Sequence, residues 1–268
     1  MVINMISRED ILTKLVNNIW SEDNKSAQLE LLRLFNEHYR KCNYEYLGKL
    51  GAFIAFNNDY IAQQYEDYEE ITNMCTGLYS TSGKCIFSNR LVIPIRGFNN
   101  KVYGFVGYDN GNNCMTDEDR IKHIPYLYMS DKYFAKDRFW LINKDEYEDA
   151  YHKGYICIVD GIFDKITLQG LGYNAVSLLG SSLTKYHRDY LRYIKNWIVF
   201  SDSDIAGNHL YDLCKYYNPN TIQVKVGGAK DIDARLRSDP NASQILENLF
   251  SSLQKEHYLF NHSLEEYV

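Results

Sequence analysis

Five aspartates in the C-terminal half of the sequence follow short apolar runs, each about as long as a buried strand. They are Asp160, Asp202, Asp204, Asp231 and Asp233. Carboxylates that lie close together repel one another unless a cation lies between them, and Mg2+ favours a few carboxylates with water and substrate phosphate. An aspartate after a strand can also cap the next helix, as Asp204 could before Ile205. For one aspartate capping is the simpler interpretation, whereas three clusters favour a divalent-metal site for phosphoryl or nucleotidyl transfer.

The elements that must position these acids are predicted to be strands of a parallel sheet. Continuous apolar runs without polar alternation are typical of strands covered on both faces. Four such runs occupy residues 155–159, 175–179, 197–200 and 221–226. The segments between them have crossover length and helical spacing, so we expect an α/β fold with helices on both sides of the sheet. Because ligands of such sheets bind outside the carboxyl ends of the strands, the aspartates are expected together at that edge.

Four motifs in this region resemble the TOPRIM domain, in the version found in DnaG-type bacterial and phage primases. They are Asp160-Gly161, the turn Leu179-Gly-Ser-Ser-Leu-Thr184 followed by His187, the segment Phe200-Ser-Asp-Ser-Asp-Ile-Ala-Gly207, and Lys230-Asp-Ile-Asp233. The family carries Glu at the position of Asp160. Aspartate also ligates metal but reaches one methylene less. We expect His187 to pack or to cap the helix that follows the second strand.

A second resemblance, to the primase core subdomain, covers the preceding part of the chain. Residues 90–96 and 102–108 are predicted to form a hairpin around residues 97–100. The primase pattern Asn-Arg-Leu-x-Phe-Pro-Ile-Arg, followed by Gly-x-x-Gly, is matched at Asn89, Arg90, Pro94, Ile95, Arg96, Gly104 and Gly107. Lys136 and Arg138 occupy the basic positions of a later primase segment, whose first half departs from the pattern at Pro125.

The resemblance implies a DNA primase core, a DNA-directed RNA polymerase that joins ribonucleoside triphosphates on a single-stranded DNA template. It implies that two or more Mg2+ or Mn2+ ions serve as cofactors. The catalytic residues so implied are Asp160, Asp202 and Asp204. The implied metal ligands are Asp160, Asp202, Asp204, Asp231 and Asp233. The implied cations for nucleotide and template phosphates are Arg90, Arg96, Lys136, Arg138 and Lys230, with surface ion pairs as the alternative role of Arg90 and Arg96.

The sequence divides into four expected segments. Residues 1–50 form a helical N-terminal segment, and residues 51–150 an α+β primase-core subdomain. Residues 151–238 form the TOPRIM domain, a Rossmann-like parallel sheet with flanking helices, and residues 239–268 a helical tail. Apolar spacing predicts one helix that starts at Ser7, a second that runs to about Tyr44, and a turn or helix end at residues 48–51. A core with both flanking primase modules absent or reduced is typical of a phage-encoded or excised domain.

Composition limits the class of protein. The 268 residues carry a formal net charge of −6, which argues against a uniformly basic nucleic-acid binder but is compatible with a local basic groove. The six cysteines form no Cys-x-x-Cys pair, so we do not expect a zinc site. We expect the cysteines to be reduced thiols. No apolar run approaches the roughly 20 residues of a membrane span, and no signal peptide is evident. We therefore expect a cytoplasmic protein, in the host cytoplasm if phage-encoded.

Two other functions use the same residues. A TOPRIM-type nuclease would cleave phosphodiesters with the same acids, although the predicted hairpin favours a primase. A non-catalytic relative would bind nucleic acid or a replication protein without turnover, and Asp160 in place of Glu motivates this alternative. Expected partners of an active core are single-stranded DNA, ribonucleoside triphosphates, and either a replicative helicase or a separate zinc-module protein.

Overall fold

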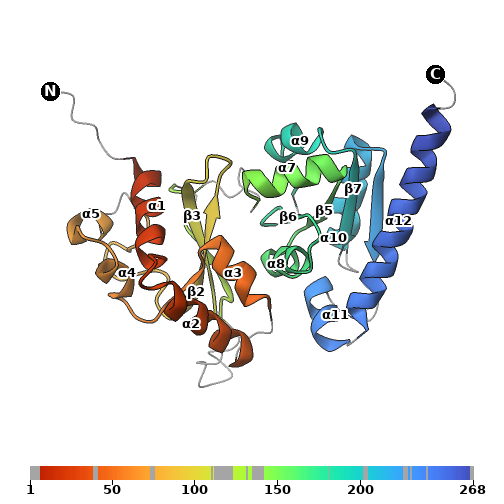
Figure 1. Ribbon diagram of the computed structural model, residues 1–268. Coiled ribbons are helices and arrows are strands. Elements are labelled where there is room, and N and C mark those ends of the chain that lie inside the picture. The colour runs from red at the N-terminus through yellow and green to blue at the C-terminus, as the bar shows by residue number, and fades with distance from the viewer. Residues whose placement is uncertain are drawn as a thin grey trace.

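The computed structural model places two four-stranded sheets side by side, each with its own helices (Figure 1). The first sheet is antiparallel, with strand order β1-β2-β3-β4, and the second is parallel, with order β6-β5-β7-β8. The structure describes residues 7–38, 42–72, 76–109, 111, 123–130, 132–134, 142–180, 182–201, 205–225, 229, 231–239 and 241–265.

Three helices precede the antiparallel sheet: α1 (Arg8–Ile19), α2 (Lys25–His38) and α3 (Tyr44–Leu50). Helix α1 starts as predicted, because the Ser7 hydroxyl accepts a hydrogen bond from the Asp10 amide. The prediction that the second helix runs to about Tyr44 is wrong. The Asn43 side chain accepts from the Tyr46 amide at 2.7 Å and so caps a new helix. Helix α3 ends as predicted at Gly51, whose φ of +81° suits glycine.

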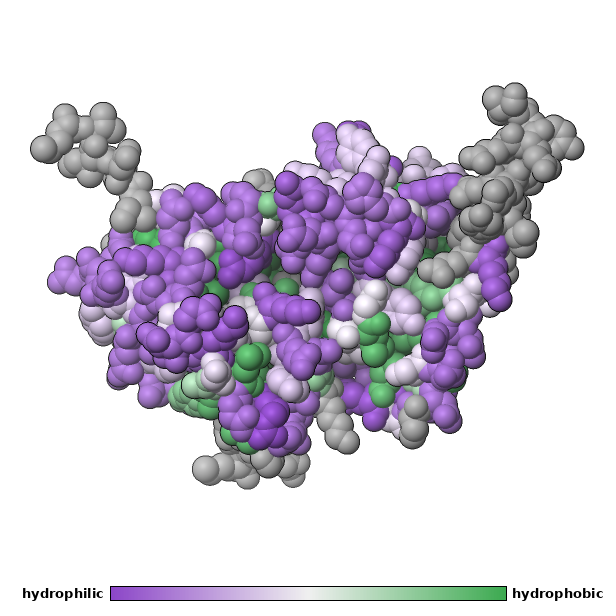
Figure 2. Space-filling view, in the orientation of Figure 1, coloured by the Kyte–Doolittle hydropathy of each residue, from purple (hydrophilic) through white to green (hydrophobic). Residues whose placement is uncertain are grey.

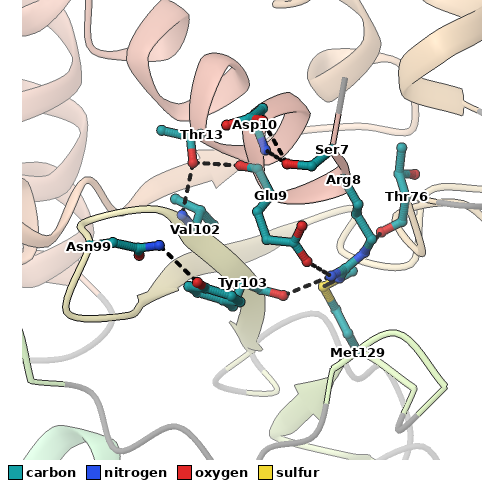
Figure 3. Close-up of polar contacts among 10 residues, drawn as sticks. All are labelled: Ser7, Arg8, Glu9, Asp10, Thr13, Thr76, Asn99, Val102, Tyr103 and Met129. Atoms are coloured by element: carbon teal, nitrogen blue, oxygen red, sulfur yellow. Dashed lines mark hydrogen bonds and ion pairs between the residues drawn. The ribbon is translucent and has the colours of Figure 1, made fainter. Parts of the chain in front are cut away.

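The antiparallel sheet is built around the predicted hairpin. Its strands are β1 (Phe53–Ala55), β2 (Arg90–Arg96), β3 (Val102–Tyr108) and β4 (Tyr126–Tyr128), and the short helices α4 (Tyr60–Gln63) and α5 (Tyr68–Thr72) lie between β1 and β2 in the chain. Strands β2 and β3 pair in antiparallel register, which confirms the hairpin. Helix α1 is fixed to β3 by polar contacts that Figure 3 shows. The Arg8 guanidinium donates to the Tyr103 carbonyl at 3.0 Å, and the Val102 amide donates to the Thr13 hydroxyl at 2.9 Å.

The parallel sheet confirms the predicted α/β architecture. Its strands are β5 (Tyr155–Val159), β6 (Ala175–Ser177), β7 (Asn196–Ser201) and β8 (Thr221–Lys225). Alternate residues of β5 enter different cores: Ile156 and Ile158 pack on one face, and Cys157 and Val159 on the other. The first core also contains residues of α7 (Lys144–Lys153), α9 (Lys185–Leu191) and α10 (Ile205–Tyr217). The second contains residues of α8 (Ile162–Gly170), α11 (Ile232–Ser238) and α12 (Ala242–Glu265).

Helix α8 joins the two halves of the molecule. Phe163 and Ile166 belong to the core of the antiparallel half, although α8 follows the first strand of the parallel sheet. The fully buried Lys165 ammonium donates to the Tyr46 hydroxyl at 2.7 Å and to the Glu146 carboxylate at 3.0 Å. Because these contacts come from α3 and α7, the two sheets are held in a fixed relation around α8. Among the described residues, no helix is both long and apolar enough to cross a bilayer.

Candidate metal site at the edge of the parallel sheet

Asp160 lies where the chain leaves β5, directly before Gly161, the N-cap of α8. Its backbone is tied to the turn after β6. The Ser177 hydroxyl and the Gly180 amide both donate to the Asp160 carbonyl, at 3.1 and 3.2 Å. Strand β6 therefore ends at Ser177, two residues before the predicted end at residue 179, because residues 178–180 turn toward Asp160. Leu179 adopts φ +56° in this turn, a conformation that is uncommon for a residue other than glycine.

A pocket of about 220 Å3 opens beside Asp160, between the two sheets. Tyr126 and Tyr128 of β4 form one wall, while Leu179 and Gly180 of the turn form another. Three carboxylates line it: Asp160, Asp164 from the first turn of α8, and Asp231, which precedes α11. The structure therefore brings two of the predicted metal ligands, Asp160 and Asp231, to one pocket and adds a third acid.

The electrostatics of this pocket are those of crowded carboxylates. Burial, together with the charges of Asp231, Asp233 and Asp160, raises the pKa of Asp164 to about 7, although a hydrogen bond from the Asp233 amide at 3.0 Å opposes the rise. Burial and the charge of Asp160 also raise the pKa of the Tyr128 hydroxyl. No lysine or arginine is found among the described residues that line the pocket.

The donor set fits a hard divalent cation. Carboxylate oxygens are the preferred protein ligands of Mg2+ and are also ligands of Mn2+. A cation between Asp160 and Asp231 would offset the part of the pKa rise of Asp164 that comes from neighbouring charges, while burial, the larger cause, would remain. Within the described ranges, no three acidic, histidine or cysteine side chains converge closely enough to hold an ion by themselves. Water, phosphate oxygens and further ligands would have to complete the coordination, as is usual for Mg2+.

Asp231 and Asp233 have different surroundings. The Asp231 side chain accepts from the Ala234 amide at 2.6 Å and caps α11 while it lines the pocket. Asp233 is 1% exposed, accepts from the Thr167 hydroxyl at 2.8 Å and pairs with Arg237 at 3.0 Å. It lines a second and larger pocket of about 570 Å3 beside α8 and α11, away from the pocket of Asp160.

The two predicted phosphate-binding arginines lie at opposite ends of β2. Six residue steps separate them, which is about 20 Å along a strand. Arg90 donates to the Ile124 carbonyl at 3.0 Å, beside the start of β4, and Arg96 donates to the Asn100 carbonyl at 2.8 Å. Burial lowers the pKa of both guanidiniums. The charge of Asp109 opposes the shift at Arg90, which lies at the end of β2 next to β4.

The matching glycines of the hairpin make room for specific side chains. A Cβ on Gly107 would lie 2.6 Å from the Phe87 ring and 2.9 Å from Cδ of Arg90. A Cβ on Gly104 would lie 2.6 Å from the Phe134 ring. These glycines therefore let Arg90 and two phenylalanines pack directly on the sheet.

Five of the predicted site residues lie outside the described residues: Lys136, Arg138, Asp202, Asp204 and Lys230. His187 has the expected packing and capping role. It is fully buried, and its Nδ1 accepts from the Thr184 amide at 3.3 Å in a capping box at the start of α9.

Asp164 and Tyr128 are the site residues that the sequence analysis missed. Asp164 has a detectable signal, because an acid in the first turn of the helix that follows Asp160-Gly161 stays near the carboxyl end of the strand. Its Oδ2 lies where a Cβ on Gly161 would be, so the glycine that follows Asp160 provides the space for a second carboxylate. Tyr128 has no local signal, since it comes from the other sheet.

Comparison with known proteins agrees with these features. Residues 157–236 match the sequence profile of the family described as Toprim-like. The DNA primase of Rickettsia bellii is 29% identical over 187 residues, which cover 66% of this chain and 29% of that protein. The DNA primase of Rickettsia prowazekii is 32% identical over 134 residues, 47% of this chain and 21% of that protein. The DNA primase of Mycoplasma genitalium is 26% identical over 210 residues, which cover 70% of this chain and 33% of that protein. The chain spans a third or less of the length of these relatives.

Solved structures show the same fold. The Aquifex aeolicus primase zinc-binding and RNA polymerase domains superpose with a TM-score of 0.70 and 19% identity, covering 94% of this chain and 63% of that chain. The DnaG primase catalytic domain bound to single-stranded DNA gives a TM-score of 0.65 and 20% identity, covering 93% and 84%. The resemblance to the catalytic core of DnaG-type primases and the α/β fold class are both confirmed.

Proposed function

We propose that this chain, which has the fold of the DnaG primase catalytic core and contains a Toprim-like domain, synthesises short RNA primers on single-stranded DNA. The observation that carries the proposal is the pocket of Asp160, Asp164 and Asp231 at the carboxyl edge of the parallel sheet. It combines clustered carboxylates, a fit to divalent cations, and a position between two subdomains. Bound Mg2+ or Mn2+ would supply charge neutralisation at the attacking and leaving oxygens of nucleotidyl transfer.

The register of the parallel sheet supports roles for Asp202 and Asp204. Ile158 of β5 pairs with Val199 of β7, so Ser201 at the end of β7 is level with Asp160. Asp202 and Asp204 follow Ser201 in sequence. With Asp160 they are the proposed catalytic acids, and Asp231 and Asp233 are the further proposed metal ligands. Asp233 would have to exchange its pairing with Arg237 for a metal, whereas Asp231 already lines the pocket.

The proposed phosphate-binding cations are Arg90, Arg96, Lys136, Arg138 and Lys230. Arg90 is supported by its position beside β4, whose tyrosines form a wall of the acidic pocket. Its role would be to hold phosphate oxygens of template or nucleotide, because a guanidinium stays charged and matches phosphate geometry. The proposed subdomain boundaries are residues 51–150 and 151–238, with residues 1–50 and 239–268 as flanking segments.

The partners of the proposed reaction are ribonucleoside triphosphates and a single-stranded DNA template. A replicative helicase and a separate zinc-module protein are the further proposed partners. The reaction would place the protein with the replicating chromosome, in the cytoplasm of a bacterium or of a phage host.

The test is incorporation of labelled ribonucleotides on single-stranded DNA with Mg2+ or Mn2+. We expect short labelled oligomers from the wild type and none from Asp202→Ala/Asp204→Ala. The matched control Asp23→Ala/Asp67→Ala removes two carboxylates from the antiparallel half and should keep full activity. Full activity of the Asp202/Asp204 variant would defeat the assignment. Cleavage of labelled DNA or RNA without added nucleotides would instead favour a nuclease.

A further inference from the structure

A basic and aromatic surface lies on the parallel half, over α9, the turn after it and the end of α10. Helix α9 and its C-cap carry Lys185, Arg188 and Arg192 at spacings of three and four residues, and these side chains are exposed or half-buried, whereas His187 and Leu191 are buried. Lys195, Lys215, Tyr193, Tyr216 and Tyr217 complete the patch, which we call the α9 surface. Figure 2 shows mainly hydrophilic residues at the top of the parallel half, where Figure 1 places α9. The charge of this surface is opposite in sign to the net charge of the chain, −6.

The turn after α9 and the end of α10 are held together. The Asn218 side chain donates to the Lys195 carbonyl at 3.1 Å, and the Arg188 guanidinium lies over the Tyr217 ring, 4.1 Å from its centre. These contacts place Arg188 and Lys195 beside the end of α10.

The two arginines of the α9 surface differ in their partners from Arg33, Arg235 and Arg237. Arg33, Arg235 and Arg237 each pair with a carboxylate. Among the described residues, no carboxylate lies within ion-pair distance of Arg188 or Arg192. Arg192 instead contacts the ring and hydroxyl of Tyr193, the latter at 2.7 Å. The guanidiniums are thus positioned by aromatic rings and keep donors for an anion from outside.

The tyrosines are exposed enough to serve as stacking platforms. Tyr193 is 56% exposed, Tyr216 79% and Tyr217 44%. The rings of Tyr216 and Tyr217 are 5.0 Å apart and nearly perpendicular, so they meet edge to face, and Tyr216 keeps the larger exposed area of the two. Exposed acids of the same helices, Asp189 and Asp212, leave the patch with more cations than carboxylates. Cations interleaved with exposed aromatic rings are the composition of surfaces that bind single-stranded nucleic acid, through phosphates and base stacking.

We propose that the α9 surface binds single-stranded nucleic acid at the edge of the parallel sheet opposite the candidate metal site. Lys195 directly precedes β7, whereas the acidic pocket lies level with the other end of that strand. A strand of six residues spans about 20 Å, on the order of six nucleotides at the 3.4 Å step of a stacked strand. Gly180 lines the pocket, and helix α9, which follows it in the chain, leads from that side of the sheet to Arg192 and Lys195. The inference rests on the proposed function only in one respect, namely whether the bound nucleic acid is the template or the product of primer synthesis.

The test measures binding of a fluorescent twelve-nucleotide oligo(dT) by anisotropy, in EDTA and without nucleotides, over a range of salt concentrations. For Arg188→Gln/Arg192→Gln we expect roughly ten-fold weaker binding at low salt. The slope of log K against log salt should fall by about 1.4, which is two phosphate contacts at about 0.7 each. The matched control Lys14→Gln/Arg33→Gln removes the same charge at exposed residues paired with Glu66 and with Glu30 and Glu37, and should bind like the wild type.

A second pair of variants tests stacking. Tyr216→Ser should weaken binding about five-fold or more, whereas Tyr68→Ser, which removes a ring that is 60% exposed on α5, should not. Unchanged binding of the double arginine variant, or an equal loss in its control, would overturn the proposal. So would an oligoglutamate peptide that competes as well as the oligonucleotide, because it would indicate an acidic protein partner.

The outcomes are separable from those of the proposed function, because the binding assay needs no metal and no synthesis. A chain that makes no primers but loses binding in the arginine variant supports the α9 surface and refutes the primase activity. A chain that makes primers and binds normally in that variant refutes the α9 surface alone.

Discussion

Replacement of Lys165 by methionine tests the connection between the two halves of the molecule. The Lys165 side chain is fully buried, and its ammonium donates to the Tyr46 hydroxyl, the Glu146 carboxylate and the side-chain amide oxygen of Gln169 at 2.7 to 3.1 Å. Burial lowers the pKa of Lys165, and the neighbouring Glu146 opposes that shift. Methionine keeps most of the volume but removes the charge and all three hydrogen bonds.

The expected loss follows from the partners that remain. The Glu146 side chain is 11% exposed, so the substitution leaves a nearly buried carboxylate without its cation. Removal of one member of a buried ion pair costs about 3–5 kcal/mol. A typical folded domain is stable by about 5–15 kcal/mol, so a large part of the stability is lost. With a urea dependence of about 1–3 kcal/mol per M, the midpoint of unfolding should fall by at least roughly 1 M.

The assay is urea unfolding followed by tryptophan fluorescence, with two comparison variants. Glu146→Gln/Lys165→Met removes both charges and should recover much of the loss, because no unpaired charge remains. Lys153→Met breaks an exposed pair with Asp149 and should cost about 1 kcal/mol or less. A Lys165→Met protein as stable as the wild type would refute the reasoning, since it would mean that the buried pair makes no net contribution.

Three further predictions concern other parts of the fold. Gly161→Ala should lower stability, because the new methyl group would overlap the Asp164 carboxylate; Gly161→Ala/Asp164→Ala should recover part of the loss in the same urea assay. Burial raises the pKa of Cys214 to about 12. Between the ordinary thiol pKa of about 8.5 and that value, only the unfolded chain loses the thiol proton, so the free energy of unfolding falls as the pH rises. Cys214→Ala removes this thiol and should make the fall less steep by up to about 1.4 kcal/mol per pH unit. Unfolding measured from about pH 8.5 to 10.5 checks the slope. Phe98→Ala should cost about 1–3 kcal/mol in thermal unfolding, because the half-buried ring stacks on Tyr190 at 4.8 Å; an unchanged midpoint would mean that the hairpin tip does not hold the two halves together.

The parallel sheet could be predicted because its strands carry a strong local signal. Residues 156–159 and 197–200 are buried on both faces, and continuous apolar runs encode that burial directly. The second run is shorter in the structure than in the prediction. Leu178 and Leu179 are apolar because they are buried, but they belong to the turn that contacts Asp160 rather than to the strand.

The composition of the site was less predictable, because it depends on contacts between distant segments. Asp231 and Asp233 are equivalent in the motif, but the start of α11 falls between them. One side chain therefore caps the helix beside the pocket, while the other is buried against Thr167 and Arg237. Tyr128 reaches the site only because β4 lies next to α8 in the folded chain. No local pattern encodes that neighbourhood.

Calorimetric titration of Mn2+ into the protein tests the central claim, that the carboxylates at this edge form a divalent-cation site. The wild type should bind Mn2+, and Asp160→Asn should bind it at least about ten-fold more weakly, because the amide removes a charged ligand from the pocket. Asp149→Asn, which changes an aspartate paired with Lys153 on α7, is the matched control and should bind as the wild type does. Equal Mn2+ affinity of the wild type and Asp160→Asn, or no binding by the wild type, would contradict the account.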